Sequence, residues 1–132
     1  MKKVLLALLL TSGVVFAGEE AANRVETMQG METAMAFIQK GFLYNNDAMV
    51  AKGIEDFTSH SQEIKSFVVD DKDIKDGDFN PRRYARNEAR VITNLAEDVL
   101  RNYQSGDKSE SVVAYNKIIS RCLACHKIIR KW

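Results

Sequence analysis

The chain has 132 residues, of which 45% are hydrophobic and 28% charged, and its formal net charge is +1. This length suits one small domain, and the near-neutral balance gives no electrostatic reason to expect binding to nucleic acid or to an anionic membrane. The sequence shows no nucleophile–base pair, phosphate-binding loop or pair of acids, so we do not expect an enzyme.

The first 17 residues have the parts of a secretory signal peptide. Met1-Lys2-Lys3 is a basic start, residues 4–16 are mostly apolar, and Val15-Phe16-Ala17 has the small-residue pattern of a cleavage site. We expect cleavage after Ala17, export to the periplasm and a mature domain of residues 18–132. The apolar stretch is short and interrupted for a membrane span, which disfavours an uncleaved anchor and predicts no stable membrane insertion.

The first predicted helix runs from about Glu20 to Tyr44. Its apolar side chains recur at steps of three and four residues, which is the spacing of one helix face. This stripe consists of Val25, Met28, Met31, Met35, Ile38 and Phe42. Asn45-Asn46-Asp47 then interrupts the pattern and offers an N-cap for the next helix.

The second predicted helix runs from about Asp47 to Phe67 and keeps the same step. Its stripe consists of Val50, Ile54, Phe57, Ser61, Ile64 and Val68. Gly53 lies in the interior, where a glycine marks either a weak point or a close approach of another backbone. Residues 69–79 are charged without an apolar period, and their glycine is misplaced for a calcium-binding EF-hand, so we expect a solvated connection.

The third predicted helix starts at Asn80-Pro81, with Asn as N-cap and Pro as the first helical residue, and runs to about Tyr103. Its stripe consists of Ala85, Ala89, Ile92, Ala96, Val99 and Tyr103. The small alanines would let a partner or a flat cofactor come close. Ser105-Gly106-Asp107 is a predicted turn.

The fourth predicted helix runs from Asp107, its N-cap, to Trp132. Its stripe consists of Val112, Tyr115, Ile119, Cys122, His126 and Ile129. Four helices with mostly short connections predict an all-α fold, and most simply an antiparallel up-down-up-down four-helix bundle.

This last helix carries Cys122-Leu123-Ala124-Cys125-His126, a C-x-x-C-H sequence that is the attachment signature of a c-type haem. In such a site the two thiols add to the haem vinyl groups and the imidazole ligates the iron. We therefore expect one covalent haem c, held through Cys122 and Cys125 and ligated by His126. Because Cys122 and His126 lie on the apolar stripe, the haem should face the bundle interior.

Other interpretations of the two cysteines have less support. A thioredoxin-like redox pair needs a βαβ context, which the sequence does not show. A structural zinc ion needs four ligands, so both histidines of the chain, His60 and His126, would have to join the two thiols. A disulfide across so short a loop on a helix is strained. The motif could also be incidental, in a four-helix interaction module without haem.

With these residues in view, the chain resembles the class II c-type cytochromes, the cytochrome c-prime family. These are exported four-helix bundles with C-x-x-C-H near the end of the last helix, whereas class I cytochromes carry it near the N-terminus. Arg130 matches a basic residue that the family commonly has on the proximal side of the haem. Arg24-Val25-Glu26-Thr27-Met28 resembles the family's R-x-x-x-M segment, although Val25 replaces the usual Gln. The resemblance implies that Arg24 lies near the haem propionates and that Met28 points at the open iron face.

Met28 is the leading candidate for the sixth iron position, because a thioether sulfur is a soft ligand that raises the reduction potential. Methionines also fill irregular gaps in cores, so Met28 could cover the iron without bonding to it. His60 is a weaker candidate, since it flanks the apolar stripe of its helix.

We therefore expect an electron carrier that cycles between Fe(III) and Fe(II) and has redox proteins as partners. The alternative is a five-coordinate haem that binds nitric oxide or carbon monoxide. The resemblance also leaves open a homodimer formed through the first two helices.

Overall fold

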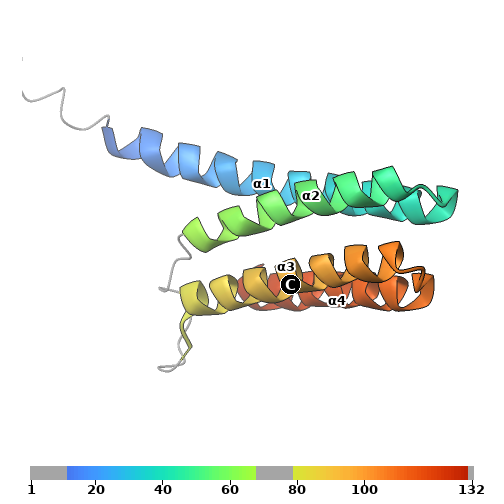
Figure 1. Ribbon diagram of the computed structural model, residues 1–132. Helices are drawn as coiled ribbons and strands as arrows, with labels where there is room; N and C mark the ends of the chain where they lie inside the picture. The colour runs from blue at the N-terminus through green and yellow to red at the C-terminus, as the bar shows by residue number, and fades with distance from the viewer. Residues whose placement is uncertain (1–11, 68–78, 131–132) are drawn as a thin grey trace, which may run out of the picture.

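The computed structural model describes residues 12–67 and 79–130, and the side chains of the first range from residue 22 onward. Within these residues the chain is entirely helical (Figure 1), and its four long helices are compatible with a four-helix bundle. The elements are α1 (Ser12–Tyr44), α2 (Asp47–Glu63), the short 3-10 helix η1 (Ile64–Ser66), α3 (Pro81–Gln104) and α4 (Lys108–Arg130). No described helix is long and apolar enough to cross a membrane.

Asparagine caps set the starts of α2 and α3, as predicted. The Asn46 side-chain oxygen accepts a hydrogen bond from the Met49 backbone N–H (3.0 Å), and the Asn80 oxygen accepts one from Arg83 (2.7 Å). Each bond satisfies a donor that the first helical turn leaves unpaired. Pro81 follows Asn80 at the first helical position, where its missing N–H costs nothing.

Some predicted boundaries were wrong. α1 begins at Ser12 rather than at Glu20, because no proline interrupts the residues between them. α2 ends at Glu63 and continues as η1 instead of extending as an α-helix to Phe67. Residues 1–11 of the predicted signal peptide, nearly all of the predicted charged connection, and the last two residues of the chain lie outside the described residues.

The helices form two closely packed pairs, α1 with α2 and α3 with α4 (Figure 1). Glycines bring α1 and α2 together: a Cβ atom at Gly53 would lie 2.6 Å from Ile38 Cγ1 and 3.0 Å from its backbone nitrogen. A Cβ atom at Gly41 would lie 2.8 Å from the backbone nitrogen of Val50. Gly53 therefore marks a close approach, one of the two roles that its position in the sequence allowed.

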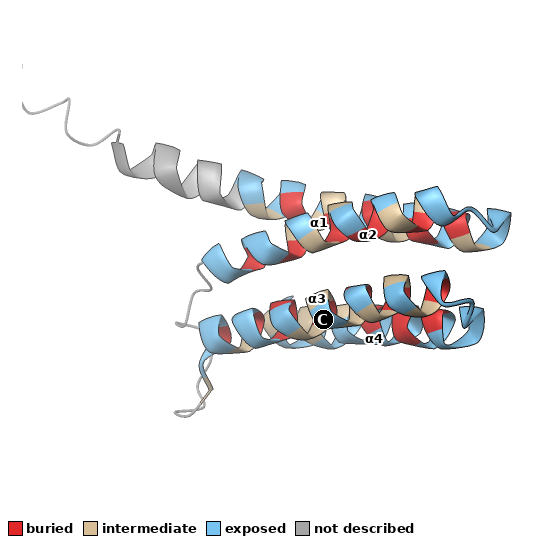
Figure 2. Ribbon diagram, viewed as in Figure 1, coloured by how far each residue is buried: buried red, intermediate tan, exposed pale blue. Residues whose placement is uncertain are grey.

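Buried side chains line the faces that the two pairs turn toward each other (Figure 2). The predicted stripe of α3 is confirmed at every position, since each of its six members is buried. Hydrogen bonds also cross between the pairs. The hydroxyls of Ser61 and Thr93 share one of 2.7 Å, and the Tyr115 hydroxyl donates to the Met35 carbonyl oxygen over 3.2 Å.

Aromatic rings close the bundle at the end where α1 meets α2. Phe42 stacks on Tyr103 and meets Tyr115 edge to face, with ring centroids 5.5 Å apart in both pairs. The Tyr103 hydroxyl donates to the Asn45 side-chain oxygen over 3.3 Å, and the Lys108 ammonium lies 3.1 Å from the Tyr103 ring centroid. These contacts hold the two helix pairs together far from the C-x-x-C-H sequence.

The predicted core stripe of α4 needs a correction. Val112 and Ile119 were expected in the core, but they are 41% and 39% exposed. The buried positions of α4 are instead Ser111, Ala114, Tyr115 and Ile118. The reason is that α4 has two apolar sides. One packs against α3, and the other, which includes Ile119, faces a cavity.

Candidate cofactor site

A cavity of about 510 Å³ lies between α1 and α4. One wall comes from α4, and its side chains are Tyr115, Ile119, Cys122, Leu123, His126 and Arg130. The opposite wall comes from α1, and its side chains are Val25, Met28, Gln29, Met31, Glu32 and Met35. Phe57 of α2 completes the lining. The fold thus brings a thiol, an imidazole and three thioethers to a single space.

The lining is mainly apolar, and part of it faces outward. Val25 and Leu123, on opposite walls, are 50% and 52% exposed, although both are large hydrophobic side chains. Such exposed apolar surface next to a concave site is typical of ligand-binding positions. Cavities of this size are the ones that accommodate cofactors and other small molecules.

Helical spacing sets the directions of the three motif side chains. Cys122 and His126 are four residues apart and both line the cavity. Cys125 is half-buried and absent from the lining. Burial raises the pKa of the Cys125 thiol, and the nearby Glu88 carboxylate of α3 raises it further. The two thiols therefore face neighbouring sides of α4, and both are free of a disulfide.

Burial changes the protonation of the motif. It raises the pKa of the Cys122 thiol to about 11, with further contributions from Cys125 and Glu88. Burial, together with the Arg130 guanidinium, lowers the pKa of His126. At neutral pH both thiols are thus protonated and the imidazole is neutral, which is the form in which a ring nitrogen can coordinate a metal.

Of the other predicted site residues, one lines the cavity and two do not. Arg130 lines the cavity beside His126, whereas Arg24 is half-buried and not part of the lining. His60 lies elsewhere, between α1 and α2. A Cβ atom at Gly30 would lie only 2.4 Å from its Nε2 atom, and its Nδ1 atom is 3.7 Å from the Glu63 carboxylate. His60 is therefore a packing residue of the α1–α2 interface.

The zinc interpretation finds no support in the described part of the chain, where no group of three or more His, Cys, Asp or Glu side chains could hold a metal ion.

Three features of the site were not predicted. Gln29 and Glu32 give the α1 wall a polar edge, and Glu32 could have been found because it follows Met28 by one helical step of four. Phe57 was predicted in the core but not at this cavity. Glu88 is only 5% exposed, and the pattern of apolar residues gave no indication that a carboxylate would be buried there.

Comparisons of the chain with protein-family models, with curated proteins and with solved structures found no match.

Proposed function

We propose that this protein is an exported monohaem c-type cytochrome that carries single electrons, built as an antiparallel up-down-up-down bundle around its haem. Cys122 and Cys125 would hold the haem through thioether bonds, and His126 would ligate the iron. Met28 would complete the coordination from α1. The observation that carries the proposal is that Cys122 and His126 line the same cavity as Met28.

The chemistry of the cavity supports a haem. The porphyrin is large, flat and apolar, and both the size of the cavity and its methionine, valine and isoleucine lining suit such a group. The two thiols would add across the vinyl groups of the haem. Cys122 lines the cavity, whereas Cys125 lies on the neighbouring side of α4, toward α3, so its thiol would have to turn toward the haem. The neutral imidazole of His126 is ready to bind iron at physiological pH.

When bound, the haem would supply the Fe(III)/Fe(II) couple. The residues of the chain would set the properties of that couple. The thioether of Met28 would favour the ferrous state, and the buried apolar side chains of Met31 and Phe57 would keep water from their side of the haem, which would disfavour the extra positive charge of the ferric state. Arg130 lines the cavity, and its guanidinium would offset the negative charge of a propionate.

Gas binding is the second candidate function, favoured by the apolar α1 wall. If Met28 covers the iron without bonding to it, the haem is five-coordinate. The neighbouring Met31 and Met35 side chains donate no hydrogen bonds, and the amide donor of this wall, Gln29, belongs to its polar edge, so nitric oxide or carbon monoxide would bind better than oxygen.

Optical spectra of the ferric and ferrous holoprotein, with and without nitric oxide, separate the two functions. We expect a low-spin spectrum with a ferric sulfur-to-iron charge-transfer band and slow reaction with the gas. A high-spin spectrum that converts at once on adding nitric oxide would reject electron carriage through a methionine-ligated haem in favour of gas binding.

A further inference from the structure

The ends of α3 and α4 that lie beside the C-x-x-C-H sequence are strongly basic. Residues 81–90 and 121–130 contain seven cationic side chains and one carboxylate, that of Glu88. The cations are Arg82, Arg83, Arg86, Arg90, Arg121, Lys127 and Arg130. The carboxylate is buried, so within these two described segments the charge shown to solvent is almost purely positive.

Four of these arginines form one exposed row on α3. Arg82, Arg86 and Arg90 are four residues apart and therefore share a helix face, with Arg83 beside them. Within the described part of the chain none of the four makes an ion pair, and Arg90 donates only to the Asn87 side-chain oxygen, over 3.0 Å.

This row is unfavourable for the stability of α3. Like charges four residues apart repel each other. Arg82 and Arg83 also lie in the first turn, where the helix dipole favours anions and where α3 has no acidic residue. Local rules broken without compensation are a mark of functional surfaces, and no described residue compensates here, which indicates that the arginines serve binding.

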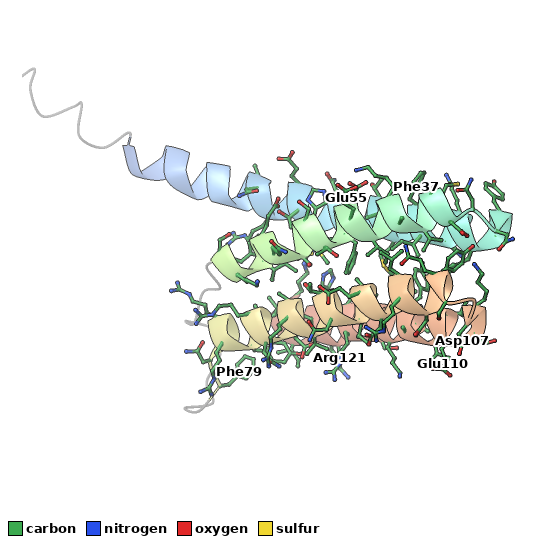
Figure 3. All side chains as sticks on the ribbon, viewed as in Figure 1. Phe37, Glu55, Phe79, Asp107, Glu110 and Arg121 are labelled. Atoms are coloured by element: carbon green, nitrogen blue, oxygen red, sulfur yellow. The ribbon has the colours of Figure 1, made fainter. Side chains whose placement is uncertain are left out.

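The opposite side of the molecule has the opposite charge. α2 contains four acidic residues and one lysine, Lys52, which pairs with two of them, Glu55 and Asp56. Figure 3 shows Glu55 and Arg121 on opposite sides of the two helix pairs. A protein with such separated charges orients itself in the field of a charged partner.

The arginine row is close to the haem-attachment sequence. Arg121 directly precedes Cys122, and its guanidinium lies 3.4 Å from the carboxylate of Glu88, which lies between Arg86 and Arg90 on α3. Beside them a groove of about 410 Å³ runs between the helices, lined by Val91, Leu95, Lys117, Ser120, Arg121 and Ala124. The lining of this groove includes two cationic side chains and no acidic one, so the groove could bind an acidic side chain of a partner.

We propose that Arg82, Arg83, Arg86, Arg90 and Arg121, named here the basic face, form the docking surface for an acidic protein that exchanges electrons with the haem. This inference rests on the proposed function. Guanidinium groups match carboxylates in paired hydrogen bonds and are enriched in protein interfaces. An anionic membrane fits less well, because surface helices insert an apolar face, and none of the large exposed hydrophobic side chains described in the structure belongs to α3.

Voltammetry of the holoprotein on gold coated with a carboxylate-terminated monolayer tests the proposal. We expect adsorption and a reversible haem wave at low ionic strength, lost at about 0.2 M salt as the charges are screened. Replacing Arg82, Arg83, Arg86 and Arg90 by Gln should weaken adsorption about tenfold or more. The matched control replaces Lys40, Lys52, Lys65 and Arg101 by Gln, which removes the same charge from other exposed positions, and it should keep most of the wave.

Equal losses of adsorption in the arginine variant and the control variant would overturn the proposal that the basic face is the docking surface, because net charge alone would then explain adsorption. Tighter binding of the wild-type holoprotein to phosphatidylglycerol vesicles than to poly-L-glutamate would reject a protein partner in favour of a membrane.

The haem spectrum of each sample distinguishes a failure of the proposed function from a failure of the docking surface. A wild-type protein without covalent haem contradicts the proposed function, whereas normal haem with indifferent adsorption contradicts only the docking surface. The arginine variant should also unfold at the same or a higher temperature than the wild type, since it removes repulsion from α3.

Discussion

Met28 on α1 and His126 on α4 line the same cavity, although they come from opposite ends of the described chain. Two other methionines of α1, Met31 and Met35, share this wall. For the proposed haem, three methionine side chains are therefore candidates for the second axial ligand of the iron, and substitution can distinguish them.

Met28→Ala should convert the ferric holoprotein from low to high spin and lower its reduction potential, because the iron loses a soft sulfur ligand. Met35→Ala is the matched control, since it truncates another methionine of the same wall and should leave the spin state unchanged. Both variants should lose up to about 2 kcal/mol of stability from the removed side chain, so stability alone does not distinguish them. A low-spin spectrum that survives Met28→Ala and disappears in Met31→Ala or Met35→Ala would assign the ligand to another residue.

Gly53→Ala should destabilise the protein, although alanine favours helices by about 1 kcal/mol over glycine. The new Cβ atom would meet the Ile38 backbone nitrogen at 3.0 Å and the Ala34 carbonyl oxygen at 3.1 Å, and neither can move without shifting α1. We expect a net loss of about 1–2 kcal/mol in urea unfolding followed by circular dichroism.

Gly30→Ala provides the comparison for Gly53. Its Cβ atom would meet the His60 ring, a half-buried side chain that can change rotamer. The double variant Gly30→Ala/His60→Ala should therefore recover the stability that Gly30→Ala loses. An equal rescue of Gly53→Ala by His60→Ala would show that the glycines act through some other contact.

Asn80→Ala should cost about 1 kcal/mol, because it leaves the Arg83 backbone N–H without the side-chain acceptor that now lies 2.7 Å away. Asn80→Asp keeps that acceptor and adds a negative charge at the positive end of the α3 dipole, beside Arg82 and Arg83. Its unfolding midpoint should equal or exceed that of the wild type. A loss as large as that of the alanine variant would refute the capping role.

The pH dependence of the haem-free mature chain follows from the motif residues. The pKa of His126 is lowered in the fold, so the unfolded chain binds more protons as the pH falls through the ordinary value of 6.5, and stability falls with it. The pKa of Cys122 is raised from 9.0 to about 11, so the unfolded chain releases its proton first as the pH rises, and stability falls there too. The urea concentration at the unfolding midpoint should therefore be highest near pH 7 to 8.

His126→Ala should reduce the loss of stability between pH 7 and 5.5, and Cys122→Ala should reduce the loss between pH 8 and 10. Unchanged pH dependence in these variants would contradict the assignments.

Helix starts and the central core were predictable from the sequence because local chemistry determines them. Asn46, Asn80 and Pro81 set the starts of α2 and α3, and the stripe of α3 is buried throughout because that helix packs on both α2 and α4. The α4 stripe was wrong at Val112 and Ile119, since a periodic pattern cannot distinguish a side that packs against a helix from a side that faces a cavity.

The motif residues were recognisable, but their surroundings depended on tertiary packing. Glu88 is polar and yet buried, and its proximity to Cys125 arises only when α3 and α4 come together. Met28 lines the cavity, and its role at a haem iron stays a prediction, whereas Arg24 does not reach the lining. Its predicted position near the propionates remains a prediction.

The intact mass and the acid–acetone extraction of the protein, produced in a bacterium with a cytochrome c assembly system, test covalent haem attachment most directly. We predict a red protein whose mass is that of the mature chain plus one haem, with the colour retained in the protein pellet after extraction and lost in Cys122→Ala/Cys125→Ala. A colourless chain with two alkylatable thiols, or haem that extracts completely into the acetone, would contradict the assignment of this protein as a c-type cytochrome.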